Sequence, residues 1–140
     1  MIAYEWRGRF ASTEVSALHA EAFVDRAGQG GAGDRGAGTR DWQDQVRRHS
    51  LGWVCARDGG DLAGFVNVAW NGGVHAFILD TMVAAGMRRR GIGTGLVAVA
   101  VREARRAGCE WLHVDFEEHL RPFYVNGCGF TPSSAGLLAL

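Results

Sequence analysis

The stretch that decides the fold is VAAGMRRRGIGTGL, residues 83–96. It follows an apolar run typical of a strand and opens a pattern with helical periodicity, so it predicts a strand-to-helix turn. Glycines at positions 91, 93 and 95 let the backbone come close to a ligand. The first N–H groups of a helix lack intrahelical partners and lie at the positive end of the helix dipole. The turn therefore predicts an anion-binding site at the helix start.

Three consecutive arginines, Arg88, Arg89 and Arg90, flank the same point. Like charges at a helix N-terminus oppose the dipole, and a bound anion would relieve that conflict. The dinucleotide fingerprint fits poorly because Leu96 replaces its last glycine, and the sequence has no G-x-x-x-x-G-K-[ST] motif. The alternative to an anion-binding site is an ordinary glycine-rich turn whose arginines are exposed to solvent.

The segments on either side of the turn predict a mixed sheet. Strand-like runs over 51–57, 62–70 and 74–83 are separated by glycine-containing turns, which indicates an antiparallel meander. A helix over 91–107 and a strand over 111–116 follow. Strand, helix and strand form a crossover unit, so the strands 74–83 and 111–116 are expected to run parallel.

The flanking elements are shorter. Ser12 is expected to cap the first helix, and Pro122 fits the first turn of a short one. Residues 27–38 contain almost no apolar side chain, so we expect a mobile loop there. The remaining predicted elements are a strand over 1–7, helices over 13–23, from 39 or 41 to 48 and over 122–126, and a last strand over 130–140.

Composition places the chain among single-domain globular proteins. It has 140 residues, 47% of them hydrophobic, and a formal net charge of zero, which gives no attraction to nucleic acid or to an anionic membrane. Three cysteines without metal-site or redox spacing indicate reduced thiols and no bound metal. The opening residues have no apolar signal core, so a cytoplasmic location is expected.

Two motifs together resemble a known family. The pattern Arg88-x-x-Gly91-x-Gly93 after a strand resembles the acetyl-CoA-binding motif of the GNAT superfamily of N-acyltransferases. The segment PFYVNGCGF, residues 122–130, looks like the family's F-Y-x-x-x-G-F segment with one extra residue. The resemblance covers residues 51–130. It implies a single α/β (α+β) domain over 1–140, with a mostly antiparallel mixed sheet flanked by helices and a splayed parallel strand pair at the cofactor site.

The resemblance also implies how acetyl-CoA, the co-substrate, is held. Backbone groups of Met82 and Val83 would hydrogen-bond the pantetheine arm. Amides of the turn and the side chains of Arg88 and Arg90 would hold the pyrophosphate. The cofactor-binding residues expected by similarity are Met82, Val83, Arg88, Arg89, Arg90, Gly91, Ile92, Gly93, Thr94 and Gly95.

Tyr124 stands at the position of the family's tyrosine, which protonates the departing CoA thiolate. A core tyrosine with a satisfied hydroxyl is the alternative. Many relatives carry Asn where Glu117 stands, and a carboxylate there would be able to take a proton from an amine. Asp115, on the same strand face, is the second candidate base. His113 is expected as a partner inside the sheet, and His119 as a solvent-facing residue.

The acceptor site is the least determined part. By similarity it lies between the first two helices, their loop and the strand ends. Acidic groups there would suit a cationic amine, whereas the tryptophans equally suit core packing. The resemblance implies N-acetyl transfer to a primary amine of a small molecule or peptide; a different acceptor, a non-catalytic acetyl-CoA-binding module and a nucleotide-binding domain are the alternatives. Relatives are often dimers. The candidate substrate-binding residues are Phe23, Trp42, Trp70, His75 and Asp80.

Overall fold

The computed structural model describes residues 1–23 and 40–140. Residues 24–39, which include the expected mobile loop over 27–38, lie outside the described part, so that expectation stays a prediction. The side chain of Phe23 is also outside it. Within the described residues, no helix combines the length and the apolar character needed to cross a membrane.

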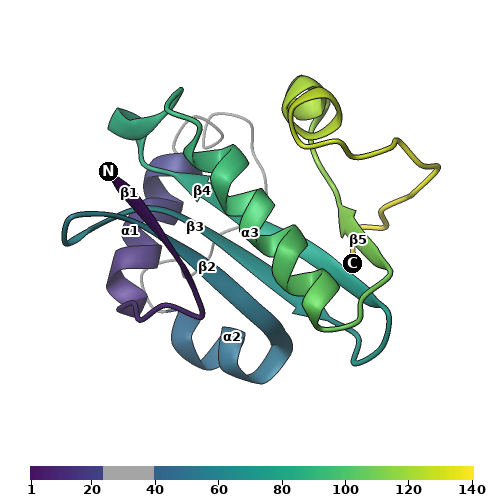
Figure 1. Ribbon diagram of the computed structural model, residues 1–140, viewed down its shortest axis with the longest axis horizontal. Coiled ribbons are helices and arrows are strands. Elements are labelled where there is room, and N and C mark those ends of the chain that lie inside the picture. The colour runs from purple at the N-terminus through teal and green to yellow at the C-terminus, as the bar shows by residue number, and fades with distance from the viewer. Residues whose placement is uncertain (24–39) are drawn as a thin grey trace.

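A five-stranded sheet forms the centre of the protein, with its strands in sequence order (Figure 1). The first four strands pair antiparallel, and the last two pair parallel. Glycines with positive φ, Gly59 at 61° and Gly72 at 81°, form the two turns of the meander. The predicted mixed sheet is therefore confirmed. The strands are β1 (Ile2–Trp6), β2 (Ser50–Asp58), β3 (Asp61–Trp70), β4 (His75–Val83) and β5 (Trp111–Val114).

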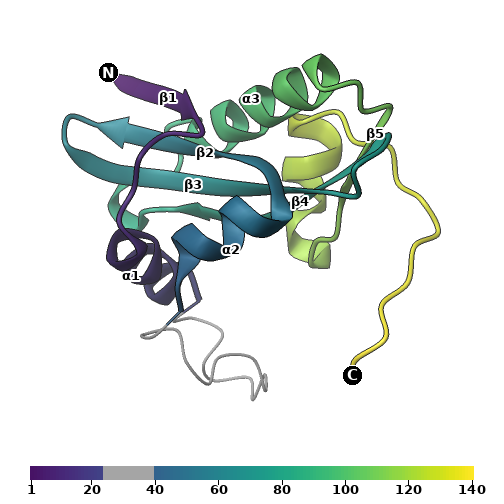
Figure 2. The same ribbon diagram turned by 90° about the horizontal axis from the view of Figure 1, so that it is seen from below.

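Helices cover both faces of the sheet (Figure 2). α1 (Ser12–Phe23) and α2 (Trp42–His49) lie on one face, and α3 (Ile92–Arg106) lies across the other. The predicted crossover is confirmed, since α3 connects β4 to the parallel strand β5. Three short segments complete the fold: η3 (Ala85–Met87), η4 (Glu118–Leu120) and the π-helix η5 (Pro122–Gly127).

Two hydrophobic clusters hold these layers together. One lies between α3 and the sheet and contains Leu96, Val97 and Ala100 of the helix. Small side chains on this face let α3 pack close to the strands, as its sequence predicts. The other cluster lies under α1 and α2 and is centred on Phe65 and Trp42, both fully buried.

Three local predictions need correction. The last strand predicted over 130–140 is wrong: residues 131–140 form no strand, and every one of them is exposed. A strand needs a neighbour for its backbone groups, and this segment pairs with none among the described residues. β5 stops at Val114 and does not reach Phe116. Ser12 is the first residue of α1, and its hydroxyl accepts the N–H of Gln43, joining α1 to the start of α2 at 3.2 Å.

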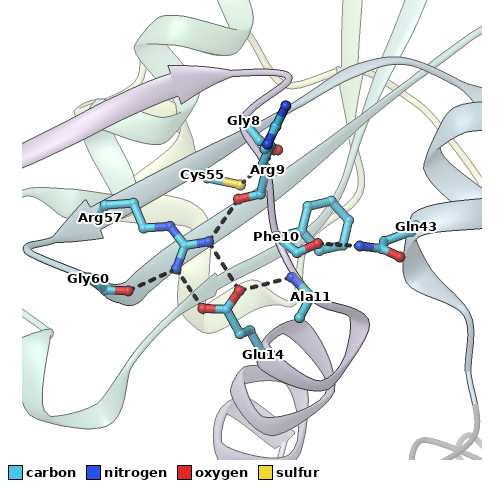
Figure 3. Close-up of polar contacts among 9 residues, drawn as sticks. All are labelled: Gly8, Arg9, Phe10, Ala11, Glu14, Gln43, Cys55, Arg57 and Gly60. Carbon is cyan, nitrogen blue, oxygen red and sulfur yellow. Dashed lines mark hydrogen bonds and ion pairs between the residues drawn. The ribbon is translucent and has the colours of Figure 1, made fainter.

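An ion pair ties α1 to the sheet (Figure 3). The Arg57 guanidinium donates to both carboxylate oxygens of Glu14, at 2.5 and 3.1 Å. It also donates to the carbonyls of Arg9 and Gly60, at 2.8 and 3.2 Å. The Glu14 carboxylate accepts the Ala11 N–H at 2.9 Å. Hydrogen bonding from Arg57 lowers the pKa of Glu14, because it stabilises the ionised carboxylate.

This ion pair gives the first prediction. Because the pKa of Glu14 is lower in the folded than in the unfolded state, the stabilisation is fully present above the ordinary carboxyl pKa of about 4.3 and is lost as pH falls through the folded pKa. Glu14→Gln should lower the free energy of unfolding at pH 7 by about 1–2 kcal/mol, measured by urea denaturation. The difference from the parent should shrink below pH 4. Arg48→Gln breaks only an exposed i,i+4 pair with Asp44, so it should cost no more than about 0.5 kcal/mol. Equal losses in the two variants would contradict the assignment.

Candidate active site

The site begins where β4 separates from β5. Their parallel pairing covers only His75–Ile78 of β4, whereas β4 continues to Val83. The pairing of β4 with β3 shifts by one residue between Phe65 and Asn67, and Asp80 has a φ of 56°. An extra residue in the left-handed region is a β-bulge, which bends the strand and re-aims its side chains. Beyond the bulge, β4 therefore runs free of β5.

The start of α3 faces the opening. Gly91 is the N-cap residue, with a φ of 75° and no capping side chain. The first backbone bond of the helix runs from the Gly95 N–H to the Gly91 carbonyl at 3.0 Å, so the N–H groups of Ile92, Gly93 and Thr94 precede the helical ladder. A Cβ added at Gly91 would meet no atom within 4 Å. This end of the helix is thus open to an anion.

The three glycines of the motif have different surroundings. At Gly93, a Cβ would come within 3.1 Å of the Phe123 ring, so the glycine lets η5 lie close to the helix start. At Gly95, a Cβ would come within 2.3 Å of Tyr4, a residue of β1. Gly95, expected among the cofactor-binding residues, therefore faces the sheet instead of the opening.

A cleft of about 860 Å³ connects these parts. It combines the second half of β4, the turn, the start of α3 and the segment after β5. Arg88 and Arg89 line it, whereas the Arg90 guanidinium contacts the Met87 sulfur at 3.6 Å. Its lining residues are Ala22, Thr81, Met82, Val83, Met87, Arg88, Arg89, Gly91, Ile92, Gly93, Thr94, Glu117, His119, Leu120, Phe123 and Tyr124.

Tyr124 lines this cleft and is buried, with 6% of its surface exposed. Its ring stacks on Phe116, with centroids 5.2 Å apart, and meets the edges of Phe123 and Phe130. Burial raises the pKa of Tyr124, and the nearby Thr81 hydroxyl opposes that rise. The phenol is therefore protonated at neutral pH, as a proton donor must be.

A π-turn explains the extra residue of the PFYVNGCGF segment. In η5 the Cys128 N–H donates to the Phe123 carbonyl, five residues earlier, at 2.9 Å. The Phe130 N–H then donates to the Tyr124 carbonyl at 3.0 Å. A π-turn holds one more residue than an α-helical turn. The extra residue is thereby absorbed, and Phe130 still packs against Tyr124.

Glu117 and His119 lie together at the mouth of the cleft. Their side chains, both more than half exposed, approach to 3.4 Å between Glu117 Oε2 and His119 Nδ1. Asp115, the second candidate base, is exposed and does not line the cleft. His119 is solvent-facing as expected, but it also lines the cleft, which its sequence position did not indicate. Only the η4 turn, which places residues 117 and 120 close together, brings it there.

Most of the candidate acceptor residues lie elsewhere. Trp42 is fully buried in the core under α1 and α2, and its indole N–H donates to Ser16 Oγ at 3.1 Å. Trp70 and His75 lie at the opposite end of β4 from the cleft, beside the β3–β4 turn. There His75 Nδ1 approaches His113 Nε2 to 2.7 Å. Asp80 forms the bulge itself.

The arrangement suits a long ligand with an anionic group. Free helix N–H groups and two arginines stand at one end, apolar side chains of Met82, Ile92 and Phe123 line the middle, and the Tyr124 phenol lies deeper. The turn is also held from the other face, because the Ala85 N–H donates to the Glu21 carboxylate of α1 at 2.8 Å. These features are those expected of a site for a phosphate-containing molecule.

Comparison with solved structures shows the fold. A protein of unknown function from methicillin-resistant Staphylococcus aureus, described as a probable acetyltransferase, superposes with a TM-score of 0.76 at 17% identity, over 100% of this chain and 98% of that one. Glucosamine-6-phosphate N-acetyltransferase from Arabidopsis thaliana gives 0.65 at 18% identity, over 99% and 98%. AAC(6')-Iy, in complex with the bisubstrate analogue CoA-S-monomethyl-acetylneamine, gives 0.72 at 15% identity, over 100% and 97%.

The sequence comparisons identify the family. No curated protein matches the chain in sequence. The family model described as "Acetyltransferase (GNAT) family" matches residues 13–130, a range that holds the sheet from β2 to β5, the helix-start turn and Tyr124. The resemblance of the two motifs is therefore confirmed at the level of the whole domain, and the chain belongs to the GNAT acetyltransferase family.

Proposed function

We propose that this protein is an N-acetyltransferase that moves the acetyl group of acetyl-CoA to a primary amine of a small molecule or peptide. The observation that carries the proposal is the single cleft that holds both the helix-start N–H groups and the Tyr124 phenol. An anion site alone would suit many ligands. An anion site joined by an apolar passage to a buried proton donor suits acyl transfer from a phosphate-bearing thioester.

Binding would use the backbone first. The pyrophosphate would accept hydrogen bonds from the N–H groups at the start of α3, beside Arg88 and Arg89. The pantetheine arm would run along Met82 and Val83, since this end of β4 has no β5 neighbour. Unpaired strand groups are able to hydrogen-bond an extended, amide-containing arm as a neighbouring strand would.

The chemistry would then follow by direct attack. The amine nitrogen forms a bond to the thioester carbonyl carbon, giving a tetrahedral intermediate. The carbon–sulfur bond breaks, and the CoA thiolate takes the proton of the Tyr124 hydroxyl. The nitrogen gives up a proton to Glu117, directly or through water. Glu117 suits this role better than Asp115, because it lines the cleft.

The activity is tested by thiol release from acetyl-CoA over a panel of polyamines, amino sugars and peptides. CoA should also raise the melting temperature, whereas NAD and ATP should not, because only a ligand that binds the folded state stabilises it. Acetyl-CoA binding without thiol release for any amine would favour a non-catalytic binding module. Release with hydroxyl acceptors alone would assign a different acceptor class.

Arg88→Ala should weaken CoA binding about tenfold, because it removes a charged hydrogen-bond donor from the anion end of the cleft. Isothermal titration calorimetry measures the change. Arg105→Ala is the matched control: it removes the same charge from the other end of α3, where the side chain is exposed. Equal loss in both variants would mean that Arg88 acts only through net charge.

Tyr124→Phe should lower kcat by ~10²-fold or more, because it keeps the ring and removes only the acid. Acetyl-CoA affinity should change little. Tyr4→Phe, a loss of the same hydroxyl beside Gly95 and away from the cleft, should leave kcat unchanged. If Tyr124→Phe folds, binds acetyl-CoA and turns over at the parental rate while chemistry is rate-limiting, Tyr124 is structural.

Glu117→Gln should lower the rate mainly at low pH, where the acceptor amine is most protonated and depends most on a base. The pH–rate profile of kcat/KM measures it. Glu118→Gln is the neighbouring control, since that carboxylate pairs with Arg121 at 2.7 Å and does not line the cleft. An unchanged profile for Glu117→Gln would move the role to Asp115 or to water alone.

A further inference from the structure

A second recess lies between α1, α2 and β2, beside the connector that joins β1 to α1. Its volume is about 520 Å³, and it shares no lining residue with the cleft of the candidate active site. Pockets that bind small organic molecules usually have volumes of about 300–1,000 Å³. The recess is therefore large enough for a ligand of its own. We call it the arginine recess after the four arginines that line it, which are Arg7, Arg9, Arg47 and Arg57.

The connector, residues 7–11, forms one wall of the recess, and side chains hold its backbone in place (Figure 3). The Gly8 carbonyl accepts the indole N–H of Trp53 at 2.8 Å. The Phe10 carbonyl accepts the side-chain amide of Gln43. The carbonyl between these two accepts the guanidinium of the ion pair with α1, at 2.8 Å. Three successive carbonyls are thus fixed in advance, which lowers the ordering cost of binding a ligand.

The charges that line the recess do not balance. Four arginines stand against one glutamate, a formal excess of three positive charges in a chain whose net charge is zero. The glutamate is Glu14, and both of its carboxylate oxygens already accept from Arg57. The charge of Glu5 also acts on Arg57, but Glu5 does not line the recess. The lining therefore has no carboxylate to spare for the other three arginines.

Those three arginines form no ion pair with the described residues. Arg7 donates to the Leu51 carbonyl at 2.7 Å, and Nε of Arg47 donates to the Gln43 carbonyl of its own helix at 3.3 Å. Both acceptors are neutral, so the charges stay uncompensated, and Arg9 is exposed. A recess that gathers uncompensated guanidinium groups attracts anions. Exposed arginines elsewhere that do pair with a carboxylate are Arg48, Arg102, Arg106 and Arg121.

We propose that the arginine recess binds a small organic anion that bears phosphate or carboxylate groups, with its acidic groups on Arg9 and Arg47 and its body against Trp53. Guanidinium groups present paired donors that match the oxygens of both acidic groups. Trp53 is partly exposed and lines the recess, so it offers an apolar surface beside the charges. The site is separate from the cleft, and its occupation does not depend on acetyl transfer.

Adenosine monophosphate and citrate are the probes for the two acidic groups, and adenosine is the uncharged control. Each is titrated into the full-length protein and followed by amide NMR at the Trp53 indole N–H and at the backbone N–H groups of residues 8–11. At least one anion should shift these signals with a Kd below about 1 mM, and adenosine should not. A response to the nucleotide alone assigns a phosphate ligand, and a response to citrate alone assigns a carboxylate ligand.

Arg9→Ala and Arg47→Ala should each raise the Kd measured at Trp53 by at least ~10-fold, because each removes a charged hydrogen-bond donor. Circular dichroism should be unchanged, since both side chains are exposed. Arg48→Ala is the matched control: it removes the same charge from the next position of α2, where Arg48 pairs with Asp44 and does not line the recess. Its Kd should stay within about twofold of the parent.

Three results would overturn the proposal. The first is that neither anion shifts the Trp53 signal at concentrations up to about 10 mM. The second is that adenosine binds as tightly as its monophosphate, and the third is an equal loss of affinity in Arg48→Ala. Signals that move only at residues 91–94 would place the anion at the start of α3 and leave the recess without a ligand. Because the readout is local, it is independent of whether the cleft binds acetyl-CoA.

Discussion

The site depends on a parallel strand pair that is joined at one end and open at the other. Over His75–Ile78, β4 and β5 share hydrogen bonds, and α3 packs over both strands through the same core. Past the bulge at Asp80, β4 leaves that ladder while its pairing to β3 resumes at Phe65–Met82. Because β3 holds β4 on its other side, the strand is rigid without β5. A rigid strand with unpaired backbone groups is prepared to accept another extended partner in the place of β5.

The two ends of the cleft are built by different forces. At the end formed by the start of α3, backbone conformation decides the shape: the N-cap is Gly91 in the left-handed region, and Arg89 has a φ of 67°. At the end that holds Tyr124, packing decides the shape, because three aromatic rings surround the phenol ring. Gly93 joins the two, since its lack of a side chain lets Phe123 reach the helix start. Preorganisation of both ends limits the reorganisation that binding would require.

Much of the fold and of the cleft could be predicted from the sequence. The features that could not be predicted have identifiable physical reasons. Turn glycines, the helix face of α3 and the crossover were predictable, because each is a local pattern with one physical solution. The bulge was not predictable, because Asp80 looks like any polar residue in a strand until the register between β3 and β4 is known. Trp42 was ambiguous because a buried tryptophan and a binding-wall tryptophan have the same local sequence signal. The strand predicted over 130–140 failed because strand propensity says nothing about the neighbour that a strand needs.

The π-turn at η5 has a consequence for how such chains tolerate changes in length. One inserted residue in an α-helix rotates everything after it by about 100°, which would carry the following aromatic away from its partner. Here the wider turn stores the insertion locally, so Phe123, Tyr124 and Phe130 keep their contacts. The π-turn therefore accommodates one additional residue next to the proposed reaction centre. A lineage could therefore gain or lose one residue there without re-evolving the pocket wall.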